Sequence, residues 1–183
     1  MERTIIFATL ATIVACGAAA QTPAPATAPE DFSNIQNFLR VNEGICTGGQ
    51  PSMEDLEKMK AQGVRSVVNL RRASEYNFEE EAATAKKLDL RYFHIPVDKN
   101  DLKDEQVEEF LKVTGDLQNR PIFIHCTSAG RVGTFWMIRR ALVDKWKVED
   151  AEVEARKIGM HDEDLRNWAL DYIKRHQAAD SKK

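Results

Sequence analysis

A histidine and a cysteine stand side by side at the end of an apolar run, and an arginine follows a short loop. The pair is His125 and Cys126, and the arginine is Arg131. The loop between them consists of Thr127, Ser128, Ala129 and Gly130. A strand-loop-helix junction favours the thiolate form of such a cysteine, because loop N–H groups and the helix N-terminus stabilise anions. The arginine adds a planar pair of donors. Together these residues indicate a cysteine nucleophile beside an oxyanion site.

The elements that would position this loop can be read from the flanking residues. An apolar strand is expected at residues 121–125, and a largely apolar, central helix at residues 132–146. Further strands are expected at residues 38–48, 64–70 and 91–97, and helices at 52–62, 75–88, 103–117, 148–158 and 164–176. Strands alternating with helices predict an α/β fold with a mainly parallel central sheet flanked by helices. Ligands of such sheets bind at the carboxyl ends of the strands, where the His-Cys pair lies.

Composition narrows the classes of function. The 183 residues carry a net charge of −3 and no basic tract, so no nucleic-acid partner is expected. Cysteine and histidine show no zinc-type spacing, so neither a metal nor a cofactor is expected. Trp136, Trp146 and Trp168 are expected in the core. Cys46 is expected to be a buried thiol, with a resolving partner for an oxidised Cys126 as the alternative.

The N-terminus has the pattern of an export signal. Residues 1–20 contain an apolar run too short to span a bilayer, which takes about 20 apolar residues, and they predict a signal peptide. Cleavage is expected either after Ala20 or before Cys16, which would then be lipidated. Residues 21–34 predict a linker rich in alanine and proline, and residues 35–178 a single folded domain. The expected location is the periplasm or a lipid anchor on a bacterial membrane.

The active-site loop resembles that of the cysteine-dependent tyrosine and dual-specificity phosphatases. Three segments in the expected order strengthen the resemblance: residues 48–52 (GGQPS), 63–71 (GVRSVVNLR) and 92–98 (YFHIPVD). They are similar to a bacterial phosphatase-like branch that is also found fused to β-lactamase-like hydrolases. The resemblance implies that Cys126 is the nucleophile, that Arg131 and the loop hold phosphate, and that His125 supports the cysteine.

The loop departs from the family pattern in one respect. Four residues separate Cys126 from Arg131, where the family has five, and Val132 stands in place of the usual hydroxyl residue. Two alternatives remain for this hydroxyl: either Thr134 supplies it, or no residue of the loop does. Rhodanese-type sulfurtransferases have the shorter loop, and their cysteine carries a persulfide.

The resemblance also places a general acid on the loop after the strand at residues 91–97. The candidates for this acid are Asp98, Asp101 and Asp104, with Asp98 favoured and Asp101 second. Helix capping is the alternative role of Asp101 and Asp104, which flank the start of the next helix. A second group of polar residues follows the strand at residues 64–70. Its members are expected either to line the pocket rim or to form a solvated cluster of ion pairs: Asn69, Arg71, Arg72 and Glu75.

These features predict a metal-independent hydrolase that acts on phosphate monoesters through a phosphocysteine. Its substrate, either a phosphoprotein or a small phosphoester, is left open, and a monomer is expected. Two alternatives remain. In the first, Cys126 transfers sulfane sulfur or carries a persulfide. In the second, the domain binds phosphorylated ligands without turnover.

Overall fold

The computed structural model describes residues 32–180. The expected signal peptide, the lipidation candidate Cys16 and most of the expected linker lie outside the described residues. The linker's final residues are described, and Phe32 is buried in the core together with Ile35.

Five short strands form one sheet in the order β1-β2-β5-β3-β4. Their bounds are β1 Leu39–Asn42, β2 Ile45–Gly48, β3 Ser66–Asn69, β4 Arg91–His94 and β5 Ile122–His125. Strand β1 runs antiparallel to β2, and the other neighbours are parallel. The predicted mainly parallel α/β fold is therefore confirmed. The central strand, β5, brings His125 to the carboxyl edge between Gly48 and Asn69.

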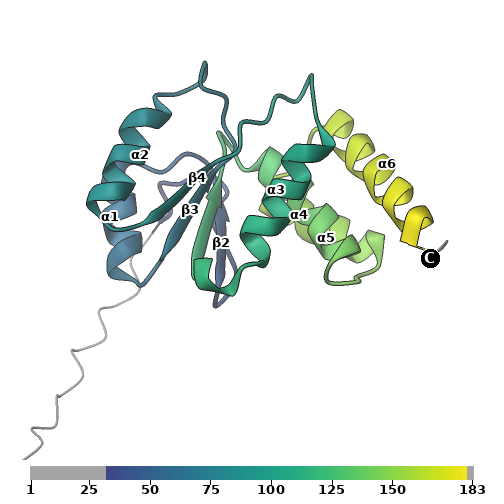
Figure 1. Ribbon diagram of the computed structural model, residues 1–183, viewed down its shortest axis with the longest axis horizontal. Coiled ribbons are helices and arrows are strands. Elements are labelled where there is room, and N and C mark those ends of the chain that lie inside the picture. The colour runs from purple at the N-terminus through teal and green to yellow at the C-terminus, as the bar shows by residue number, and fades with distance from the viewer. Residues whose placement is uncertain (1–31, 181–183) are drawn as a thin grey trace, which may run out of the picture.

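Helices cover both faces of the sheet (Figure 1). On one face lie α1 (Met53–Ala61) and α2 (Phe78–Lys87). On the other lie α3 (Asp104–Gly115), α4 (Gly130–Leu142), α5 (Val148–Ile158) and α6 (Glu163–Asp180), with a short 3₁₀ turn, η1 (Leu117–Asn119), before β5. Within residues 32–180, no helix is both long and apolar enough to cross a membrane.

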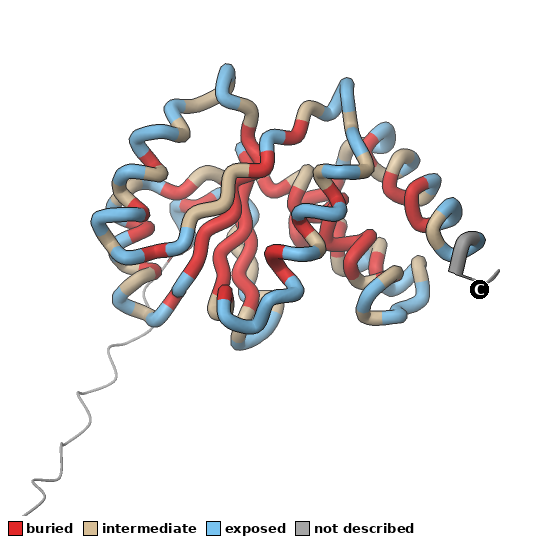
Figure 2. The backbone as a smooth tube through the Cα atoms, in the orientation of Figure 1, coloured by how far each residue is buried: buried red, intermediate tan, exposed pale blue. Residues whose placement is uncertain are grey.

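The core consists of two layers, because the central strand is buried on both faces. Ile122 and Ile124 point into the larger layer, beneath α3 to α6, whereas Phe123 points into the smaller layer with Leu56 of α1. Alternate side chains of a strand face opposite sides of the sheet, so a continuous apolar run is what a doubly covered strand needs. Figure 2 shows the central strands β2, β3 and β5 as buried along their whole length.

Local signals predicted the first helix well. The Ser52 side chain accepts a hydrogen bond from the backbone of Asp55, and the Asp55 carboxylate accepts one from the backbone of Ser52. This reciprocal capping box fixes the start of α1. Gly63 follows the helix with a φ of 88°, the left-handed conformation that suits glycine at a helix end.

Several expectations about the elements were wrong, including the strand expected at residues 91–97, which ends at His94. Helix α4 ends at Leu142 rather than residue 146, and Lys145 adopts a φ of 59°, so Trp146 lies on a loop. Trp146 is 39% exposed and stacks under Arg140 instead of entering the core, whereas Trp136 is buried as expected. Helix α2 begins at Phe78, which leaves residues 72–77 as a loop beside the active-site edge.

Candidate active site

Cys126 lies at the floor of a cavity of about 460 Å³, at the point where β5 ends. Cys126 is 2% exposed to solvent. The loop after it is held against the end of β2, where the Gln50 N–H donates to the Thr127 carbonyl at 3.2 Å. Gly49 permits this approach, because a Cβ there would come within 2.7 Å of the same carbonyl oxygen. The contacts with the end of β2 therefore fix the position of the loop after Cys126.

Helix α4 starts immediately after this short loop. Its N-cap residue, Ala129, is left-handed with a φ of 65°, and it has no polar side chain to cap the helix. The first N–H groups of a helix have no partner inside the helix, and the helix dipole adds positive potential there. The α4 N-terminus is therefore available to an anion in the cavity.

The Arg131 side chain is fixed by several acceptors around the cavity wall. It donates to both carboxylate oxygens of Glu75, at 3.0 and 2.7 Å, to the Val97 carbonyl at 2.8 Å and to the Thr127 hydroxyl at 3.0 Å. Burial opposes its charge, but the hydrogen bonds to Glu75 and the charge of that carboxylate raise the pKa of Arg131 above its ordinary value. The guanidinium is thus preorganised beside the cysteine.

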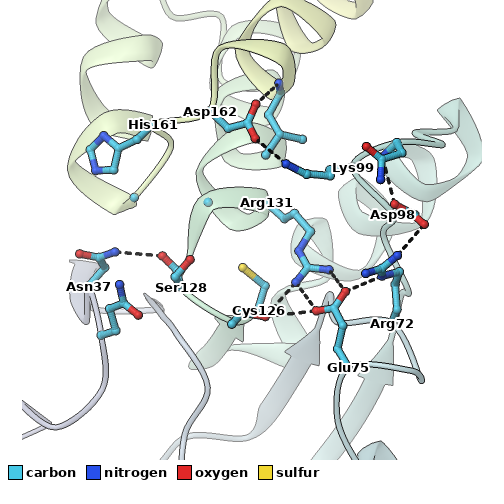
Figure 3. Close-up of a pocket in the computed structure, with 16 residues that line it drawn as sticks. Asn37, Arg72, Glu75, Asp98, Lys99, Cys126, Ser128, Arg131, His161 and Asp162 are labelled. Carbon is cyan, nitrogen blue, oxygen red and sulfur yellow. Dashed lines mark hydrogen bonds and ion pairs between the residues drawn. The ribbon is translucent and has the colours of Figure 1, made fainter.

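An alternating chain of charges runs from Arg131 to the expected acid (Figure 3). Glu75 bridges Arg131 and Arg72, whose Nε donates to the carboxylate at 2.6 Å. Arg72 in turn donates to Asp98 at 2.8 Å. Both readings of the polar cluster are thus partly right, because Arg72 and Glu75 line the cavity and also form ion pairs.

Glu75 should make the stability of the folded protein depend on pH in the acid range. Burial raises the pKa of Glu75, but the bonds from Arg131 and Arg72 lower it from 4.5 to about 2. Its stabilisation is complete above pH 4.5 and is lost as the pH falls through about 2, which amounts to at most about 3 kcal/mol. Urea midpoints of the wild type should therefore fall more steeply than those of Glu75→Gln across this range. Parallel curves would show that Glu75 is not held ionised.

Asp98 lines the cavity as the sequence predicts, but its carboxylate points toward Arg72 rather than toward Cys126 (Figure 3). The backbone N–H of Asn100 and the Arg72 side chain both donate to it, and they hold the pKa of Asp98 below its ordinary value. Asp98 is therefore a carboxylate in this state, and a general acid has to carry a proton.

The other expected acids lie outside the cavity. Asp101 pairs with Lys103 at 3.1 Å, and Asp104 bonds to Arg175 at 2.7 Å. Neither caps α3 by its side chain, since the N-cap position is occupied by Lys103.

The structure also shows where Thr134 and Cys46 lie. The hydroxyl of Thr134 donates to the Gly130 carbonyl at 3.0 Å within α4, so it is not offered to the cysteine. Cys46 is buried as expected, but it lies in the smaller core layer and Cys126 in the larger one. Opposite faces of the sheet thus separate the two thiols, and Cys46 is not placed as a resolving partner.

A buried carboxylate lies behind the His-Cys pair, and the sequence analysis did not single it out. Glu81 of α2 is fully buried, and its Oε1 lies 2.9 Å from Nε2 of the equally buried His125. The Asn69 amide and the Tyr92 hydroxyl donate to its other oxygen at 2.8 and 3.1 Å. Burial raises the pKa of Glu81, but the adjacent His125 and the bond from Tyr92 lower it below the ordinary value.

Other cavity residues also come from segments that the sequence analysis did not single out. Lys99 lies beyond β4, and His161 and Asp162 lie between α5 and α6. Their order in the chain carries no signal of a shared site. Gly133 of α4 helps to bring α5 close, because a Cβ there would come within 2.6 Å of the Ala155 carbonyl oxygen.

The fold and the site together define a class. A mainly parallel sheet with a His-Cys loop at its carboxyl edge, an arginine at the following helix and a cavity above them is the arrangement of the phosphatase-like α/β proteins. Residues 27–174 match the family described as DSP-PTPase phosphatase fused to NAD⁺ kinase, and the chain belongs to that family.

Similar proteins agree with this assignment. A β-lactamase hydrolase-like protein of Agrobacterium fabrum is 28% identical over 120 residues, which are 62% of this chain and 27% of that protein. The chain thus spans about a quarter of the length of this relative. A DUF442 structure from Shewanella putrefaciens has a TM-score of 0.65 at 18% identity and covers 78% of this chain and 91% of that one. P. aeruginosa TpbA has a TM-score of 0.62 at 22% identity, with coverages of 84% and 92%. The resemblance inferred from the motifs is confirmed.

Proposed function

We propose that this protein hydrolyses phosphate monoesters through a phosphocysteine on Cys126. One observation carries the proposal: the cysteine, the Arg131 side chain and the uncapped start of α4 meet in one cavity. A nucleophile, a fixed guanidinium and backbone donors are what in-line attack on a phosphoryl group requires. Membership of the phosphatase family supports the same reaction.

The reaction has two steps. The Cys126 thiolate attacks phosphorus, the bond from phosphorus to the leaving oxygen breaks, and the leaving oxygen takes a proton from Asp98. Water then attacks the phosphocysteine and gives a proton to Asp98, and the phosphorus–sulfur bond breaks. Inorganic phosphate leaves and the thiolate is restored. Arg131 and the α4 N-terminus stabilise the charge on the phosphoryl oxygens in both steps.

Asp98 has to exchange its partner for this role. It is ionised and bonded to Arg72 in the free protein, so donation to a leaving group requires that it take up a proton and part from Arg72. Both side chains are partly exposed, and exposed ion pairs contribute little, about 0–1 kcal/mol. Such a pair can open when substrate enters the cavity.

Sulfur transfer is the second candidate, and two observations favour it. The loop has four residues between Cys126 and Arg131, and Asp98 is not directed at the cysteine in the free protein. A persulfide carrier needs an activated cysteine and an anion site but no acid for a leaving alcohol.

Asp98→Asn separates the two candidates. For a phosphatase, kcat for phenyl phosphate should fall by about 10²–10⁴-fold, because phenolate leaves poorly without a proton. For a sulfurtransferase, thiosulfate-to-cyanide transfer should be unchanged. The measurements are phosphate and thiocyanate release by the full chain.

The matched control is Asp101→Asn, an exposed aspartate of the same loop that pairs with Lys103. It should retain the wild-type rates. Thiosulfate turnover by the wild type without phosphate release would reject the phosphatase.

A further inference from the structure

The cavity is larger than the phosphoryl group that it is proposed to hold. Its volume of about 460 Å³ falls within the range of about 300–1,000 Å³ that is typical of small-molecule sites. The phosphoryl group would occupy the floor, against Cys126 and the start of α4. The remaining space is therefore where the leaving group lies, and its walls indicate what that group is. This reasoning rests on the proposed function.

Several hydrogen-bonding side chains line the cavity beyond its floor, alongside apolar surface. Five of these side chains can donate or accept hydrogen bonds: Gln36, Asn37, Asn100, Ser128 and His161. Of the described residues that line the cavity, none is Phe, Tyr or Trp, and Leu165 is the one large aliphatic. A site for an aryl group needs apolar or aromatic surface to cover the ring. The described part of this lining has no Phe, Tyr or Trp ring, and its polar side chains can replace water as hydrogen-bond partners of hydroxyl groups on a leaving group.

The lining of the cavity also includes a cation. Lys99 lines the cavity, and its ammonium lies 3.3 Å from the Asp162 carboxylate, on the side of the cavity away from Asn37 (Figure 3). The Lys99 side chain is 61% exposed, so this ion pair is weak. Arg72 also lines the cavity, and its ion pair with Asp98 is likewise partly exposed to solvent. An incoming anion can therefore exchange with these carboxylates.

We propose that the substrate is a phosphate ester of a small, hydroxyl-bearing leaving group that carries a second anionic group, and that Lys99 binds this second group. The first phosphoryl group lies on the loop with Arg131, and the second exchanges with Asp162 at Lys99. Lys99 is then a specificity-determining residue, because it touches the leaving group and not the reacting phosphorus. Aryl monophosphates fill the phosphoryl position alone.

Competition against para-nitrophenyl phosphate tests this proposal in the full chain. The probes are fructose 1,6-bisphosphate, fructose 6-phosphate and phenyl phosphate. The bisphosphate should compete about tenfold more tightly than either monophosphate, since it adds a charge-assisted contact. Lys99→Gln should reduce this ratio to about threefold or less. The preference should also weaken as salt is raised, because Lys99 is exposed.

Lys103→Gln is the matched control. Lys103 is 56% exposed on the same loop and pairs with Asp101 at 3.1 Å, but it does not line the cavity. This variant should keep the tenfold ratio. Equal competition by all three probes, tightest competition by phenyl phosphate, or an unchanged ratio in Lys99→Gln would each overturn the proposal.

A binding measurement separates this proposal from the proposed function. Calorimetric titration of the same probes into Cys126→Ser needs no turnover. If the wild type hydrolyses nothing but the bisphosphate still binds more tightly by way of Lys99, the second anion site stands and the phosphatase reaction fails. If the wild type hydrolyses phosphate esters but binds the bisphosphate no more tightly than the monophosphates, the phosphatase reaction stands and the second anion site fails.

Discussion

Cys126→Ser is expected to lower kcat for para-nitrophenyl phosphate by at least about 10³-fold, the scale on which removal of a nucleophile acts. A serine hydroxyl is not an anion at neutral pH and needs a base to attack phosphorus. The neighbouring His125 is fully buried and does not line the cavity, so it is not placed to act as that base. The measurement is steady-state hydrolysis by the full chain under reducing conditions.

The structure offers a matched control for this substitution. Cys46 is also a buried cysteine, but it lies in the other core layer. Cys46→Ser should retain the wild-type rate at temperatures where it remains folded, as judged by circular dichroism. Residual turnover in Cys126→Ser comparable with that of the Cys46 variant would show that the thiolate is not the nucleophile.

Glu81→Gln is expected to give a large loss of stability, about 1–3 kcal/mol, which is the scale for leaving a buried polar group unsatisfied. Its carboxylate is fully buried and receives the Asn69 amide and the Tyr92 hydroxyl, next to His125. An amide in its place turns one buried acceptor into a donor, which the Asn69 amide and the Tyr92 hydroxyl cannot both satisfy. The measurement is urea unfolding at neutral pH.

Glu80→Gln provides the comparison within the same helix. Glu80 is exposed, and exposed substitutions of this kind usually change stability by no more than about 0.5 kcal/mol. A loss in Glu81→Gln no larger than that in Glu80→Gln would mean that the buried pair contributes nothing. The Glu81 variant should also slow alkylation of Cys126 by iodoacetamide, because His125 directly precedes the nucleophile.

The sequence by itself determined the core of the site. An apolar strand, His125, Cys126, a short loop and Arg131 are consecutive, so local geometry alone carries them to one place. The α/β class followed from the alternation of strands and helices, which is also a local property. The start of α1 was predictable for the same reason, since its capping box spans four consecutive residues.

Only the tertiary structure decided which charged residues serve the loop. Glu79, Glu80 and Glu81 are consecutive and alike in sequence, and the rotation of α2 against the sheet buries only the last of them. Glu75 reaches Arg131 because α2 starts at Phe78, later than the sequence pattern predicts. Asp98 was identified as a candidate acid, but its bond to Arg72 joins two loops 26 residues apart. Contacts of this range depend on how the whole sheet is ordered, and no short pattern encodes them.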